Sequence, residues 1–245
     1  MVELIDISKS FNGTVVLNEL NLILNDYEVH SLIGQSGVGK TVLIKIILGL
    51  IRPDKGRVFI DGEDVTNYSE DEMNEHVRTK IGMVYQNGAL WDSMTIGENL
   101  KLVLQIKKVI SEEEINLKVK ESLELVEMPD FENKYPEELS GGMKKRIAVA
   151  RAIILKPKYI IYDEPSTGLD PVLTNTIDDL ITKLNKEQKI TSLVISHNIK
   201  SAEKISDRIS MLYNGKIIHT CNAKEIWNQD DEIFNKFIHG DTSFQ

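Results

Sequence analysis

The sequence predicts an α/β fold in which one large domain carries an inserted helical subdomain. Strand-like and helix-like segments alternate along most of the 245 residues, a pattern typical of a sheet covered by helices. A glycine-rich loop joins a short apolar strand to an apolar helix at residues 34–39. A block of about sixty residues, from about 95 to 155, is helical in pattern, and we expect the helical subdomain to span approximately residues 87–156. The α/β part then comprises residues 1–86 and 157–245 of a single domain.

Each element follows from local signals. Short runs of apolar and β-branched residues predict strands over residues 2–7, 15–24, 29–33, 58–60, 81–85, 159–162 and 190–195. The Asn12-Gly13 turn joins the first two into an N-terminal antiparallel β subdomain. Helical patterns cover residues 40–50, most of 95–155, the stretch after Pro171 and the end of the chain from about residue 223. Ser140 has the position of an N-cap, and Pro53 bars the helix at 40–50 from continuing.

Composition excludes several classes of protein. The chain has 29 Lys+Arg against 38 Asp+Glu, a net charge of −9, which argues against nucleic-acid binding as its main role. Cys221 is the only cysteine, so a disulfide framework is excluded. The most apolar stretch, residues 42–51, is too short to span a membrane, and the first residues are not those of a signal peptide. We therefore expect a cytoplasmic protein.

A phosphate-binding loop is the strongest motif. The pattern G-x-x-x-x-G-K-[ST] is matched by Gly34, Gln35, Ser36, Gly37, Val38, Gly39, Lys40 and Thr41. The glycines let successive N–H groups point at phosphate oxygens, and the following helix adds its positive N-terminal end. In this pattern Lys40 meets the β- and γ-phosphates, and Thr41 offers its hydroxyl to Mg²⁺.

Two acids follow a later apolar strand. Residues 159–162 end in Asp163 and Glu164. A phosphate loop needs a second element that binds Mg²⁺, and Asp163 suits that role. The alternation of a strand turns Glu164 in another direction, where it can activate the attacking water. An acidic pair after a strand is unremarkable alone, and it gains this meaning from the phosphate loop.

A second helix start resembles an anion site. Ser140, Gly141 and Gly142 open a helix with a basic first turn, so its free N–H groups and helix dipole favour an anion. Two such helix starts in one chain need an explanation. Two copies of the chain placed head to tail, each closing the other's nucleotide site, supply one.

Taken together, the motifs resemble those of the ATP-binding subunit of ABC transporters, in the family's order and over nearly the whole chain. Residues 34–41 match Walker A, residues 139–143 the LSGGQ signature, and residues 159–163 Walker B. Two departures are Met143 at the fifth signature position and Tyr27 in place of a common glycine. We expect a chain with both departures to hydrolyse ATP. The resemblance implies a P-loop NTPase fold with a RecA-like core.

The resemblance also assigns roles to single residues. It makes Glu164 the catalytic carboxylate, Gln86 the Q-loop residue that senses Mg²⁺ and the attacking water, and His197 the switch histidine. Asp170 matches the D-loop, and Phe11 stands where the family stacks an aromatic ring on adenine. ATP then lies between Walker A of one subunit and the signature of the other, with Mg²⁺ held by the residues Thr41, Gln86 and Asp163.

Three short segments point to a sub-family. The forms LSGGMKKR, GKTVLIK and YQNGAL are similar to those of Mla/Mce-type phospholipid transport ATPases. This similarity implies a homodimer on the cytoplasmic face of the inner membrane, bound to an Mla-type permease. An MCE-domain lipid-binding protein and a small regulatory subunit are further candidate partners. Residues 87–91 are expected to help form the groove for a permease helix.

Two other functions stay open. One is the ATPase of a different ABC importer or exporter, for an amino acid, a metal or a peptide. The other is a soluble ABC protein of translation or DNA repair, which the single phosphate loop and single signature disfavour. A pure binding module is disfavoured because Glu164 and His197 are both present.

Overall fold

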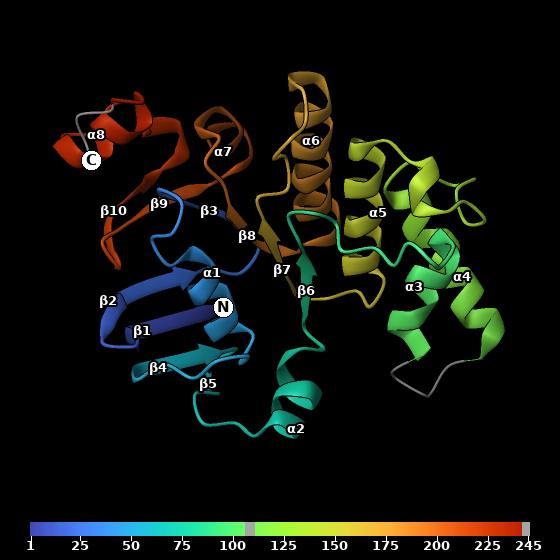
Figure 1. Cartoon of the computed structure of the whole chain (residues 1–245), viewed down its shortest axis with the longest axis horizontal. Coiled ribbons are helices and arrows are strands. Elements are labelled where there is room, and N and C mark those ends of the chain that lie inside the picture. The colour runs from blue at the N-terminus through green and yellow to red at the C-terminus, as the bar shows by residue number, and fades with distance from the viewer. Residues whose placement is uncertain (106–110, 242–245) are drawn as a thin grey trace.

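The structure is a computed structural model that describes residues 1–105 and 111–241. Figure 1 shows two sheets on one side and a group of helices on the other. The strands are β1 (Val2–Phe11), β2 (Thr14–Leu24), β3 (Val29–Ile33), β4 (Lys55–Ile60), β5 (Glu63–Asp64), β6 (Ile81–Val84), β7 (Tyr159–Asp163), β8 (Thr191–Ile195), β9 (Arg208–Tyr213) and β10 (Lys216–Asn222). The α-helices are α1 (Lys40–Ile47), α2 (Glu70–Glu72), α3 (Ile96–Gln105), α4 (Glu112–Leu125), α5 (Gly141–Ile153), α6 (Pro171–Gln188), α7 (Ile199–Ile205) and α8 (Glu232–Ile238).

The two sheets differ in strand direction. Four strands form an antiparallel sheet in the order β2-β1-β4-β5, which contains the predicted N-terminal hairpin. Six strands form the second sheet in the order β10-β9-β3-β8-β7-β6. Strands β9, β3, β8, β7 and β6 run parallel, and β10 returns antiparallel to β9. Parallel strands place their carboxyl ends at one edge of the sheet, where ligands bind in α/β folds.

The core lies on both faces of the parallel sheet. Tyr159 and Ile161 of β7 pack with α1 and the antiparallel sheet. Ile160 and Tyr162, the alternate residues of the same strand, pack with α3, α4, α5 and α6. This is the period-2 alternation of a strand that is buried on both faces. Consequently α1 and α5 lie on opposite sides of strands β6, β7 and β8 (Figure 1).

The first helix after the phosphate loop ends earlier than the sequence predicts. α1 stops at Ile47 rather than near residue 50. Gly49 takes a left-handed φ of 63°. Its N–H donates to the carbonyl of Ile46 at 3.0 Å, and the N–H of Leu50 donates to that of Lys45 at 2.8 Å. This pair of bonds is a Schellman motif, so glycine ends the helix before Pro53 can act.

Two further differences concern the end of α5 and a short helical segment. α5 ends at Ile153, a few residues before the predicted end near residue 156. The helical turn Glu70–Glu72 continues into a π-helix over Met73–Val77, and the sequence patterns did not predict either of them. Both lie away from the phosphate loop in the chain. A three-residue helix is too short for hydrophobic periodicity to reveal it, which explains why the sequence patterns did not predict α2.

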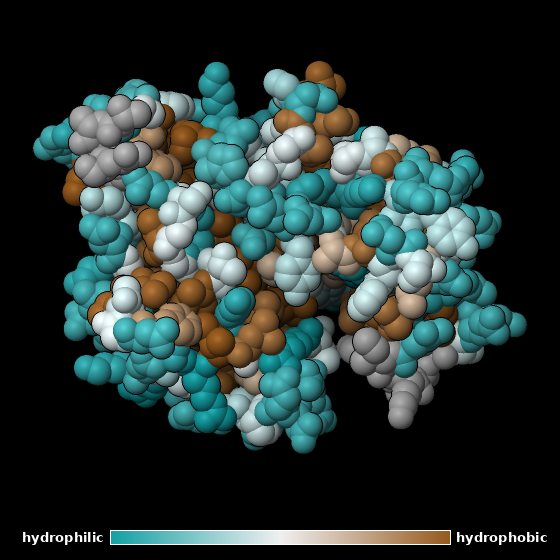
Figure 2. Space-filling model, viewed as in Figure 1, coloured by the Kyte–Doolittle hydropathy of each residue, from teal (hydrophilic) through white to brown (hydrophobic). Residues whose placement is uncertain are grey.

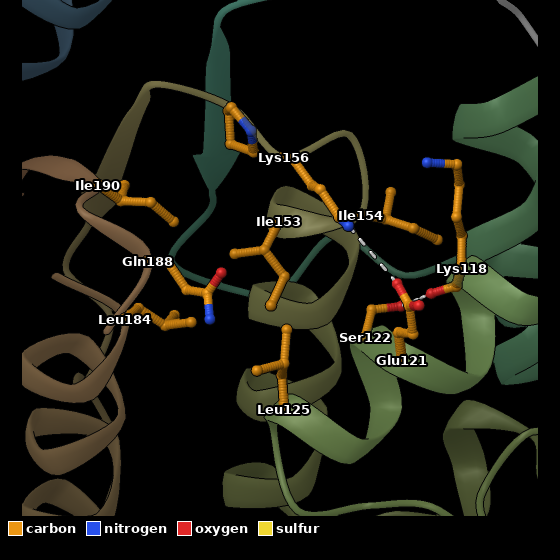
Figure 3. Close-up of a pocket in the computed structure, with 11 residues that line it drawn as sticks. Lys118, Glu121, Ser122, Leu125, Ile153, Ile154, Lys156, Leu184, Gln188 and Ile190 are labelled. Carbon is orange, nitrogen blue, oxygen red and sulfur yellow. Dashed lines mark hydrogen bonds and ion pairs between the residues drawn. The ribbon is translucent and has the colours of Figure 1, made fainter. Parts of the chain in front are cut away.

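The helical region meets the α/β core around a small cavity of about 80 Å³ (Figure 3). Leu125 of α4, Ile153 of α5 and Leu184 of α6 line it. Lys156 forms an ion pair of 3.7 Å with Glu121 beside it. The cavity contains none of the predicted site residues. Within residues 1–105 and 111–241, no helix has both the length and the apolar character needed to cross a membrane.

Candidate nucleotide-binding site

The phosphate loop leaves β3 and turns into α1. Gly34 has a φ of 153°, and a Cβ there would lie 2.4 Å from the carbonyl oxygen of Leu212. Gly39 is the N-cap of α1 with a φ of 109°, and a Cβ there would lie 2.9 Å from the Leu17 side chain. Both positions therefore require glycine, for backbone conformation and for space. The loop is built as the motif predicts, with β2 packed against its end.

Lys40 is buried at the centre of this loop. Its side chain is 7% exposed, and its ammonium donates to the carbonyls of Gly34 at 2.6 Å and Gln35 at 2.7 Å. Burial lowers the pKa of Lys40, and attraction from Glu164 and Asp163 acts in the opposite direction. The ammonium of Lys40 is thus held inside the loop by two main-chain carbonyls, at the position where the motif predicts a phosphate-binding lysine.

We expect Lys40→Ala to lose nucleotide binding. Each hydrogen bond to a charged group contributes about 1.5–3 kcal/mol, so affinity should fall at least about tenfold. A labelled-ATP titration measures the change. Lys45→Ala, an exposed lysine on the same helix, is the matched control and should bind normally. Equal affinity of Lys40→Ala and the control would contradict the assignment.

The two acids sit where β7 ends. Asp163 is the last residue of the strand. Burial, and then the charge of Glu164, raise the pKa of Asp163, while Lys40 and Lys145 lower it. Glu164 adopts a left-handed φ of 49°, and its N–H donates to the carbonyl of Ile195 at 3.0 Å. The reversal of backbone direction after Asp163 turns the second carboxylate toward neighbouring strand ends.

Three side chains converge on the Oε2 atom of Glu164. Thr167 Oγ1 donates to it at 2.9 Å, and Gln86 Nε2 lies at 3.4 Å. His197 Nδ1 lies at 3.2 Å, on a side chain that is 58% exposed. Gln86 follows β6, Glu164 follows β7 and His197 follows β8, so three parallel strand ends meet here. The structure brings these three predicted residues together.

The donors predicted for Mg²⁺ are chemically suitable. Thr41 supplies a hydroxyl, Gln86 an amide oxygen and Asp163 a carboxylate, and magnesium prefers such oxygen ligands together with water and phosphate. Asp163 pairs with Ile195 of β8, which in turn pairs with Leu32 of β3, so this acid lies at the same edge of the sheet as the phosphate loop that leaves β3. Bound Mg²⁺ would supply charge neutralisation of the phosphates there.

The signature residues lie apart from the phosphate loop. Ser140 caps α5, and its Oγ accepts from the N–H of Met143 at 3.4 Å. A Cβ on Gly142 would lie 3.0 Å from the side chain of Leu173, at the start of α6. α5 and α1 lie on opposite sides of strands β6–β8 (Figure 1). The predicted anion sites at the starts of these two helices therefore do not form a single binding site within one chain.

Two predicted residues have local partners. Asp170 is the N-cap of α6, where its Oδ1 accepts from the N–H groups of Val172 at 2.8 Å and Leu173 at 2.9 Å. This cap accounts for Asp170 in the structure, and its contact with a nucleotide stays a prediction. Phe11 ends β1 and is 43% exposed, with Lys9 Nζ 5.5 Å from its ring centroid. The stacking of this ring on a base stays a prediction.

Sequence reasoning missed three residues that touch the site. Thr167 donates to Glu164. Lys145, 7% exposed, donates from its Nζ to the main-chain carbonyl of Gln86. Arg151 donates to the carbonyl of Gly88 at 2.8 Å and to that of Ala89. The spacing of Lys145 was a usable signal, because it falls on the helix face of Gly142, Ala148 and Ala152, which is buried.

A groove adjoins this site. It has a volume of about 460 Å³ and is mostly apolar, with Met83 and Leu102 among its lining residues. Tyr85, next to Gln86, is 43% exposed in it, and Trp91 is 56% exposed. The space-filling view is hollowed between the surface near α2 and that of α3 and α4, with apolar surface on both sides (Figure 2). Exposed aromatic residues around such a hollow are typical of a protein-binding surface.

Comparison with known proteins identifies the family. Residues 17–167 match the family described as "ABC transporter". The chain belongs to the ABC transporter family. It is an ABC-type ATPase, the ATP-binding component of such a transporter. Cassettes of this family dimerise and pair with membrane permeases.

Similar proteins carry importer or transport names. The methionine import ATP-binding protein MetN of Legionella pneumophila (strain Lens) is 37% identical over 243 residues, 99% of this chain and 71% of MetN. The Fe(3+) ions import ATP-binding protein FbpC of Escherichia coli O157:H7 is 36% identical, covering 99% and 68%. The probable ribonucleotide transport ATP-binding protein mkl of Mycobacterium tuberculosis (strain ATCC 25618 / H37Rv) is 36% identical, covering 98% and 66%.

Solved structures agree with the fold. The ATP-binding cassette MJ0796, in a dimeric post-hydrolysis state bound to ADP and Pi, has a TM-score of 0.83 and 33% identity, covering 91% of this chain and 99% of its own. CbiO1 from Clostridium perfringens, part of the ABC transporter complex cbiONQ, has a TM-score of 0.86 and 27% identity, covering 97% and 94%. The predicted α/β nucleotide-binding fold is thereby confirmed.

The expected sub-family is not supported. The relatives above are named for methionine import, iron import and ribonucleotide transport, and none of them is named for phospholipid transport. An ATPase of another ABC importer, the alternative from the sequence, fits these names better. The three short segments that suggested an Mla/Mce-type protein are too few residues to outweigh similarity over the whole chain.

Proposed function

We propose that this chain is the ATP-hydrolysing subunit of an ABC importer for a small solute. Two copies close on ATP and open after hydrolysis, and the movement drives a membrane permease. The convergence of Gln86 and His197 on the carboxylate of Glu164 is the observation that carries the proposal. It is the arrangement expected for a carboxylate that activates a water molecule beside a bound triphosphate.

Each residue then has a task. Residues 34–39 and Lys40 bind the phosphates, and Phe11 stacks on the base. Glu164 accepts a proton from the attacking water, while Thr167 fixes the direction of its carboxylate. Gln86 and His197 hold the water and the γ-phosphate from either side. Thr41, Gln86 and Asp163 would hold Mg²⁺. Asp170 lies at the expected dimer interface.

A homodimer follows from the separation of the two anion sites. Ser140 and the glycines after it begin α5, which packs on the opposite face of strands β6–β8 from α1 and the phosphate loop before it. In a head-to-tail pair this helix start would face the γ-phosphate on the other copy. The helix dipole and free N–H groups favour an anion there. The division into a core, 1–86 and 157–245, and a helical subdomain, about 87–156, belongs to the same proposal.

The permease is proposed to dock in the groove beside Tyr85 and Trp91. This groove adjoins Gln86, so a helix seated in it would sense whether the site is closed. The chain would then act as a peripheral protein on the cytoplasmic face of the inner membrane. A soluble substrate-binding protein on the far side is expected for an importer.

Co-purification tests this function. The chain is isolated from detergent-solubilised membranes of its source, and the accompanying proteins and lipids are identified. A polytopic permease together with a solute-binding protein supports the importer. Ribosomes or nucleic acid without any membrane protein would overturn the transporter reading and leave only the ATPase.

We expect Trp91→Asp to lose the permease in the same experiment while retaining ATP binding, because a charge replaces an exposed aromatic in an apolar groove. Trp227→Asp is the matched control, since Trp227 is 39% exposed and does not line the groove. Undiminished recovery of the permease with Trp91→Asp would contradict the docking proposal.

Phospholipid transport is the second candidate. It is favoured by the segments LSGGMKKR, GKTVLIK and YQNGAL, whose form is similar to that of Mla/Mce-type ATPases. A permease accompanied by an MCE-domain protein, a small regulatory subunit and bound phospholipid would establish this candidate in place of the solute importer. Either result leaves the roles of Lys40 and Glu164 unchanged.

A further inference from the structure

A lysine is buried where the signature helix passes the Q-loop. Lys145 lies on α5 with a side chain that is 7% exposed. Its Nζ donates to the main-chain carbonyl of Gln86. Burial lowers the pKa of Lys145, and the charges of Glu164 and Asp163 raise it. Burying an ammonium is costly unless it is partnered, so this contact fixes where the end of β6 lies relative to α5.

The residue that Lys145 contacts, Gln86, also approaches the catalytic carboxylate of Glu164. Lys145 holds the carbonyl of Gln86, and the side-chain amide of the same residue lies 3.4 Å from Glu164 Oε2. A single residue thus joins the buried ammonium to the carboxylate. A shift of its main chain would move the amide away from Glu164, because both groups belong to one residue.

The same helix begins at the signature. Lys145 follows the Ser140 cap by five residues, about 7.5 Å along the helix axis at 1.5 Å per residue. Arg151, further along α5, donates hydrogen bonds to the main-chain carbonyls of Gly88 and Ala89. It therefore holds the helix to the segment after Gln86 at a second point. α5 therefore carries the anion-binding helix start at its tip and is fastened to the Q-loop along its side.

We propose that Lys145 is a positioning residue for ATP hydrolysis, which acts by holding the Gln86 main chain so that the Gln86 amide meets Glu164. Through α5 it links the signature, which faces the other copy's nucleotide, to the catalytic carboxylate of its own chain. The proposal deepens the proposed function and rests on it. Lys145 itself touches no substrate.

A double-mutant cycle with Gln86 tests the proposal. Lys145→Met keeps the side-chain length and removes the charge-assisted hydrogen bond, so kcat should fall about tenfold or more, with KM for ATP within about threefold. Lys145→Arg should restore kcat to within about threefold of the parent. In a Gln86→Ala background the amide is absent, so Lys145→Met should lower kcat less than about threefold further.

Controls separate this effect from a loss of folding. Lys118→Met removes a lysine from α4 whose ammonium pairs with Glu114, and it should leave kcat unchanged. Thermal unfolding is recorded for every variant, and Lys145→Leu, which also lacks a donor, replaces Lys145→Met in the cycle if the latter does not fold. An unchanged kcat for Lys145→Met, or an equal loss with and without Gln86, would overturn the inference. Normal turnover of Glu164→Gln would instead overturn the proposed function, so the two failures are distinguishable.

Discussion

Glu164→Gln should bind ATP as tightly as the parent chain and hydrolyse it about 10²–10⁴-fold more slowly, the range of general-base contributions. The amide keeps the size of the carboxylate but cannot take a proton from water. Its oxygen still accepts from Thr167, which lies 2.9 Å from the carboxylate in the parent structure. Turnover is measured by phosphate release at saturating ATP, and binding by titration with labelled ATP.

Glu187→Gln is the matched control for this substitution. Glu187 is exposed near the end of α6, and the same loss of charge there should leave both parameters unchanged. If Glu164→Gln turned over within a few-fold of the control, Glu164 would not be the catalytic carboxylate. A parallel loss of binding would mean that the carboxylate serves the phosphate loop rather than the water.

Ser140→Arg should stop hydrolysis while a single chain still binds ATP. The arginine removes the N-cap hydroxyl and places a bulky side chain at the helix start that is proposed to meet the other copy's γ-phosphate. The phosphate loop lies across strands β6–β8 from this helix and is untouched. Binding to the monomer and turnover should therefore separate, with turnover falling at least about 100-fold, as for loss of oxyanion-stabilising donors.

The control for this variant is another N-cap serine. Ser111 caps α4 and accepts from the N–H of Glu114 at 3.2 Å, so Ser111→Arg removes a similar cap from the same helical region. A lost cap costs about 0.5–2 kcal/mol of stability, which both variants should share. If Ser140→Arg lowered binding and turnover together, or if Ser111→Arg matched it, the cross-subunit site would be wrong.

The sequence predicted the parts of the site that are local. The phosphate loop needs a strand, glycines with positive φ and a helix, and these signals are consecutive in residues 29–47. The sequence also predicted where β6, β7 and β8 end, because apolar runs stop at Gln86, Asp163 and His197. Parallel pairing of these strands then brings the residues together, which no single segment encodes.

The missed residues depend on tertiary contacts. Lys145 is one of two adjacent lysines in a basic helix start. Its spacing marks the buried face of α5, but only the packing of α5 against β6 brings it to the Gln86 carbonyl. Thr167 reaches Glu164 through the left-handed turn at that residue, a conformation that propensity does not predict for glutamate. Asp170 caps α6 in the structure, a contact that the sequence patterns did not predict, and its expected contact with the nucleotide stays a prediction.

The transported substance was the weakest prediction because the ATPase does not contact it. Sequence forms around Met143 and Lys145 suggested phospholipid, while the relative that matches over 243 residues is named for methionine import. The residues that bind and hydrolyse ATP are shared by both kinds of transporter. Identification of the permease and its external partner distinguishes them.

The most direct test of the claim that two copies complete each site is a measurement of molecular mass in solution. The Glu164→Gln variant is measured with and without ATP and Mg²⁺. We expect 27.8 kDa without nucleotide and twice that mass with ATP, because ATP is bound but not hydrolysed. Adding Ser140→Arg should return the ATP-bound protein to 27.8 kDa. An ATP-saturated Glu164→Gln chain that stays monomeric at every concentration would show that two copies do not complete each site.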